Sequence, residues 1–159
     1  MKKWKLVTFA LVFMLGCLIL VPVACAASTF ATDLDLYRTR NKATSDDTRE
    51  LVAYVADGRL FARSLGKVGP RTSSAIRSYV TTLDNLDSLT RRIVRDQRSS
   101  ERLLADVLKL ASRNYTAAAW TLLKRGLAGQ ERFLKTISSA QTLMAKCRVL
   151  RAQLTPAGG

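Results

Sequence analysis

The sequence from Arg71 to Arg125 contains neither glycine nor proline. These two residues end or weaken helices most strongly, so nothing in this range forbids one continuous helix of about 80 Å. Apolar residues recur there at helical spacing, first from Ile76 to Ile93 and then from Leu104 to Ala111. The pattern predicts an all-α protein, and nothing in the sequence indicates strands.

Between these two apolar stripes lies the sequence RDQRSSER, residues 95–102, which has no apolar side chain. This segment is either a turn or an exposed stretch in the middle of a helix. Because Ser99 or Ser100 would cap a new helix well, we expect a turn here. Further helix ends are expected at Gly69-Pro70 and at Lys124-Arg125-Gly126.

These boundaries predict four helices of similar length joined by short connections, the first beginning near Ser45-Asp46-Asp47 and ending near Lys67. Such a pattern is typical of an up-down-up-down four-helix bundle. The alternative is a long helical hairpin that oligomerises to cover its apolar stripe. The expected organisation is a signal peptide over 1–26, a flexible lead over 27–45, the bundle over 46–154 and a disordered tail over 155–159.

The N-terminus has the pattern of a secretory signal peptide. Three lysines precede an uncharged apolar segment, Leu6–Val21. Ala24-Cys25-Ala26 fits the small-residue requirement of signal peptidase, so we expect cleavage after Ala26, with Ala27 as the first mature residue. The protein would then be exported to the periplasm or the extracellular space.

Two other outcomes of export stay open. In a lipoprotein, Cys25 or Cys17 would be retained as an acylated residue, although neither preceding sequence matches the usual motif well. Alternatively, Leu6–Ala27 is about long enough to remain as an uncleaved membrane anchor, with the rest of the chain outside the cytoplasm.

The chain contains no histidine, which excludes histidine-based catalytic triads, two-histidine zinc sites and covalent haem attachment. We therefore expect no metal and no cofactor. The acid in the most apolar sequence context, Asp106, is expected to pair with Arg102 rather than to act in catalysis. The sequence thus predicts a binding protein and not an enzyme.

Cleavage of the signal would leave Cys147 as the remaining cysteine. It follows Met144 at core spacing, so we expect a small buried apolar side chain. An intermolecular disulfide and a reactive thiol are the alternatives. Trp120 is expected at the core or its edge, beside a run of alanines.

The net charge is +14, and it is about +11 once the three lysines of the signal are removed. On a continuous helix, four arginines of the run between 91 and 102 fall within roughly 60° of arc. We call this set the arginine ridge, and it is our candidate anion-binding site: Arg91, Arg95, Arg98 and Arg102. A second basic region follows nearer the C-terminus: Lys124, Arg125, Arg132, Lys135, Lys146, Arg148 and Arg151.

The charge favours partners that are anionic: an envelope polymer, lipid headgroups or an acidic protein. The arginine ridge also has a structural interpretation, as the solvated back of an amphipathic helix. The arginines are not interleaved with exposed aromatic residues, which argues against specific nucleic-acid binding. The alternative function is that of a structural or accessory subunit of an oligomeric envelope or secretion assembly.

Overall fold

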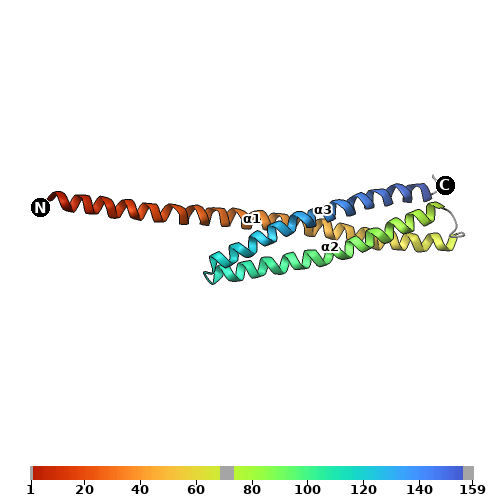
Figure 1. Ribbon diagram of the computed structural model, residues 1–159. Coiled ribbons are helices and arrows are strands. Elements are labelled where there is room, and N and C mark those ends of the chain that lie inside the picture. The colour runs from red at the N-terminus through yellow and green to blue at the C-terminus, as the bar shows by residue number, and fades with distance from the viewer. Residues whose placement is uncertain (1, 69–73, 156–159) are drawn as a thin grey trace. The chain divides into compact units, whose positions relative to one another are not determined.

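The computed structural model describes residues 2–68 and 74–155, and the side chains of 29–65 and 74–155. Its described part is helical: α1 spans Lys2–Val68, α2 Ser74–Ser112 and α3 Thr116–Leu154 (Figure 1). The prediction of an all-α protein is confirmed. The prediction of a four-helix bundle is wrong, because three helices are found in the described residues.

The chain divides into two compact units, residues 1–36 and residues 37–159. The described part of the first unit is the N-terminal portion of α1. The predicted signal peptide and its cleavage residues, Ala24, Ala26 and Ala27, lie outside the residues whose side chains are described. Among the residues whose side chains are described, 29–65 and 74–155, no helix is both long and apolar enough to cross a bilayer.

The second unit is a bundle of three helices in which α2 and α3 form a hairpin and α1 contacts both (Figure 1). Its inward-facing residues are separated alternately by four and three positions. In α1 they are Tyr37, Asn41, Thr44, Thr48, Leu51, Val55 and Gly58. In α2 they are Tyr79, Leu83, Leu86, Thr90, Ile93 and Gln97, continuing through the half-buried Ser100 and Leu104 to Val107. In α3 they are Ala119, Leu123, Gly126, Gln130, Phe133, Ile137, Ala140, Met144 and Cys147.

This spacing is the heptad repeat of a coiled coil, in which the inward residues of each helix fit between those of its neighbours. Contacts join Thr44 to Gln97 and Tyr37 to Ser100, so α1 and α2 are antiparallel. Arg148 and Arg151 contact Glu50 and Asp57 in the same order along the chain, so α1 and α3 are parallel. The unit is therefore a three-helix antiparallel coiled coil.

The turn that we expected at Ser99 is absent, because α2 runs without interruption from Ser74 to Ser112. RDQRSSER contributes Gln97 to the core, where this residue is only 5% exposed and forms hydrogen bonds with Asn41 and Thr44 of α1. The turn lies instead between α2 and α3. Asn114 has a φ of 62° there, a left-handed conformation that asparagine adopts more readily than most residues.

Gly126 is not the helix stop that we predicted but a buried residue inside α3. A Cβ atom at this position would lie 2.8 Å from Leu103 Cδ2 and 2.8 Å from Tyr37 Cε2, so glycine permits close packing of all three helices. Residues 27–45, which we expected to be a flexible lead, are helical, and Tyr37, Asn41 and Thr44 from this range are buried.

Candidate anion-binding site

The arginine ridge lies on the continuous part of α2, and all four of its residues are exposed. Arg91 forms an ion pair with Asp87 at 3.0 Å, and Asp87 also binds Arg59 from α1. The other three members of the ridge form no ion pair with any residue that the structure describes: Arg95, Arg98 and Arg102. The structure thus keeps the ridge on one helix face and leaves three of its four charges without a carboxylate partner.

Beside the ridge, a cavity of about 330 Å³ lies between α2 and α3, with Tyr37 of α1 in its wall. We call it the α2/α3 cavity. Its lining comes mainly from two stripes at a spacing of four, three and four residues: Arg92, Asp96, Ser99 and Leu103 on α2, and Arg125, Gly129, Arg132 and Thr136 on α3. Ser100, Gly126, Gln130 and Phe133 complete it. The α2 stripe is about a quarter turn around the helix from the arginine ridge.

The cavity exists because small residues occupy positions where coiled coils usually carry long side chains. Ser99 and Gly129 lie on the facing stripes of α2 and α3. A Cβ atom built on Gly129 would have no neighbouring atom within 4 Å, whereas the one on Gly126 would collide with its neighbours. The two glycines of α3 therefore differ: packing requires Gly126, while Gly129 borders open space.

Three cations line the cavity, from Arg92, Arg125 and Arg132, together with one carboxylate, from Asp96. None of these four residues forms an ion pair within the part of the chain that the structure describes. In the other half of the bundle, residues at the helix edges do pair: Arg148 Nη2 lies 3.1 Å from Glu50 Oε1, and Arg151 binds Asp57. Within the described residues, the three cations of the cavity therefore have no ion-pair partner, whereas Arg148 and Arg151 do.

The inner wall of the cavity is polar, and most of its polar groups have hydrogen-bond partners. The hydroxyl of Tyr37 lies 2.7 Å from Ser100 Oγ and donates to the carbonyl oxygen of Ser100 at 3.2 Å. Burial raises the pKa of Tyr37, while the hydrogen bond to Ser100 acts in the opposite direction. Gln130 is 2% exposed; its Nε2 donates to the carbonyl oxygen of Tyr37 at 3.2 Å, but its Oε1 has no hydrogen-bond partner.

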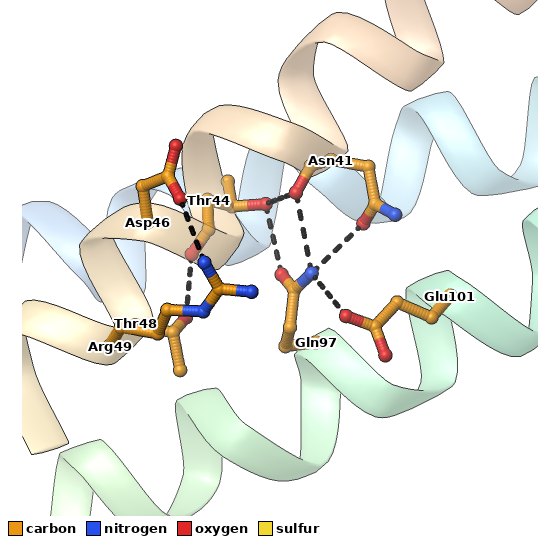
Figure 2. Close-up of polar contacts among 7 residues, drawn as sticks. All are labelled: Asn41, Thr44, Asp46, Thr48, Arg49, Gln97 and Glu101. Atoms are coloured by element: carbon orange, nitrogen blue, oxygen red, sulfur yellow. Dashed lines mark hydrogen bonds and ion pairs between the residues drawn. The ribbon is translucent and has the colours of Figure 1, made fainter.

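A second polar layer lies next to this wall and connects α1 to α2 (Figure 2). Gln97 Nε2 donates to Asn41 O and Oδ1, both at 3.3 Å, and to Glu101 Oε1 at 3.0 Å. Thr44 Oγ1 donates to Gln97 Oε1 at 2.9 Å. These groups satisfy one another, so they determine how α1 is aligned with α2 rather than offering a site to a ligand.

Cys147 is fully buried, and burial raises the pKa of its thiol, which suits an inert core residue. Trp120 is half-buried, with Lys124 Nζ 4.4 Å from its ring centroid. Asp106 is exposed, and the expected ion pair with Arg102 is not found among the described residues. That same part of the chain contains no group of three or more cysteine or acidic side chains that could hold a metal ion.

The cavity was not predicted from the sequence, although its lining residues recur at helical spacing. Arg125 and Arg132 had been assigned only to a general basic region, and Arg92 lay in the arginine run but off the ridge. Their spacing to Gly129 and Asp96 would have placed them on two helix stripes if α2 and α3 had been predicted as unbroken helices. Comparison with protein-family models, with curated proteins and with solved structures finds no match to this chain.

Proposed function

We propose that this protein is an exported binding module that attaches to anionic components of the cell envelope through the arginine ridge of α2. The observation that carries the proposal is the set of three exposed guanidinium groups, of Arg95, Arg98 and Arg102, on one helix face without carboxylate partners. Since cations on an exposed face attract anionic surfaces, this face is suited to lipid headgroups or an acidic polymer.

The closed core also supports a module that works as a single chain. The alternative hairpin needed a second chain to cover its apolar stripe, but here α1 covers the stripes of α2 and α3, burying Leu51 and Val55 with them. An oligomeric assembly would then have to use a surface other than this core.

The test is co-sedimentation of the protein isolated after export, which is expected to begin at Ala27, with vesicles of phosphatidylglycerol or of phosphatidylcholine. We expect binding to the anionic vesicles and its loss at high salt, because salt screens exposed charges. A variant with Arg95, Arg98 and Arg102 changed to glutamine should bind about 100-fold more weakly, because each charge near the surface contributes about 1 kcal/mol.

The matched control changes Lys124, Lys135 and Lys146 to glutamine, which removes the same charge from α3. A smaller loss in this control would support the ridge as the binding face. Equal losses in the two variants would mean that only net charge matters and would contradict the proposal, as would equal binding to both kinds of vesicle. Light scattering across a range of concentrations would reveal the assembly alternative as a mass that rises with concentration.

A further inference from the structure

We propose that the α2/α3 cavity is a binding site for a phosphate monoester group, held by Arg92, Arg125 and Arg132. This site is separate from the arginine ridge, and the proposal does not depend on binding at that ridge. It assigns to the protein a discrete ligand in addition to a charged surface.

The charge of the lining fits this group. Three arginines and Asp96 give the cavity a formal charge of +2. A phosphate monoester carries about −1.5 to −2 near neutral pH, whereas a carboxylate carries −1. Guanidinium groups also match the terminal oxygens of a phosphate in paired hydrogen bonds, which gives arginine its preference for such ligands.

The backbone at Gly129 supports a ligand in the cavity. Glycine inside a helix costs about 1 kcal/mol relative to alanine, and no neighbouring atom lies close enough to require it. Its absent side chain leaves the surface of α3 open between Arg125 and Arg132, which lie four residues before and three residues after it. Close approach of a ligand to the backbone is one of the roles for which glycine is suited.

The rest of the lining indicates an organic phosphate rather than a bare ion. Leu103 and Phe133 provide apolar walls, and a cavity of about 330 Å³ lies within the range of small-molecule sites. The buried Oε1 of Gln130 lacks a donor. Because Gln130 lines the cavity, a hydroxyl of the ligand, or a water that the ligand orders, would donate the missing hydrogen bond to this oxygen.

The phosphate could belong to a free metabolite or to the end of a lipid, and the experiment separates these sources. The full chain in a mild nonionic detergent is titrated calorimetrically with glucose 6-phosphate, inorganic phosphate, glucose and glucuronate. Vesicles of phosphatidic acid, whose headgroup is a phosphate monoester, are compared with vesicles of phosphatidylglycerol, whose headgroup is a diester. We expect saturable binding of a phosphate monoester from at least one source, and weaker binding of the carboxylate.

Two variants with the same change in charge locate the site. Replacing Arg92, Arg125 and Arg132 by glutamine should weaken phosphate monoester binding about 100-fold or more, since each guanidinium contributes charge-assisted hydrogen bonds. The triple glutamine variant of Arg95, Arg98 and Arg102 should change it by less than about threefold, because these residues do not line the cavity. The exposed positions of all six arginines make loss of folding a minor concern, and circular dichroism checks it.

G129A provides an independent readout, because it removes no charge. It should bind the phosphate monoester at least tenfold more weakly while its thermal stability is unchanged or raised. The proposal is overturned if no phosphate monoester binds, if glucuronate binds equally well, if the ridge and cavity variants lose binding equally, or if G129A binds like the parent chain.

Discussion

The contrast between the two glycines of α3 leads to a quantitative prediction about packing. G126A should destabilise the bundle, because the added Cβ would lie 2.8 Å from Leu103 Cδ2 and from Tyr37 Cε2. The end of a leucine side chain can rotate away, but the Tyr37 ring is held through its hydroxyl by Ser100. Overpacking of this kind costs about 1–3 kcal/mol.

G129A is the matched control, since it makes the same change three residues further along the same helix. Both variants gain about 1 kcal/mol from the higher helix propensity of alanine. Only G126A has the collision, so the difference between the two variants isolates the steric cost. We expect G129A to be more stable than the parent by about 0.5–1 kcal/mol, and G126A to lie about 1–3 kcal/mol below G129A.

The assay is urea unfolding of both variants and the parent chain, followed by circular dichroism. Midpoints at unchanged slope convert directly to free energies of unfolding. The same shift in both variants would refute the reasoning, because it would mean that Gly126 is not at a close three-helix contact.

Three further predictions concern ionisation, reactivity and processing. Burial raises the pKa of Tyr79 from 10.0 to about 12, so the folded state retains a proton that the unfolded chain releases. This group should therefore not affect the free energy of unfolding below pH 10, and it should lower that free energy as the pH rises from 10 toward 12. In urea unfolding across this range, the midpoint should fall less steeply for Y79F than for the parent chain. Cys147, in a chain whose other cysteines are changed to serine, should react with a maleimide slowly when native and rapidly in denaturant; equal rates would contradict its burial. Intact-mass analysis of fractionated cells should find a chain beginning at Ala27; a membrane form that retains Cys25 with added lipid, or the whole N-terminus, would rule out cleavage after Ala26.

The helical class was predictable because apolar residues recur at helical spacing along the inner faces of the bundle. Leu83, Leu86 and Ile93 are examples from the stripe that begins at Ile76, and all three are buried in the core. The two segments misassigned as a flexible lead and as a turn face each other across the polar layer. Asn41 and Thr44 belong to the first, and Gln97 belongs to the second.

Each of these segments looks too polar to be buried when it is considered alone. Their side chains are buried because they satisfy each other's hydrogen bonds, and that relationship joins positions more than fifty residues apart. Gly126 was misread for a similar reason. A glycine after Lys124-Arg125 is typical of a helix end, and the neighbours that require it, Tyr37 and Leu103, are distant in sequence or on another helix.

The heptad spacing continues without interruption through the paired part of all three helices. Adding or removing a single residue within one helix would rotate everything beyond it by about 100°, which would carry core side chains to the surface. An insertion or deletion of seven residues, which is two helical turns, is the smallest that returns the core-facing residues to the same side of the helix. The two facing helices would have to change in length by the same amount. Related bundles should therefore differ in length by seven residues in each of the three helices. Insertions of a single residue should be found at the turn around Asn114.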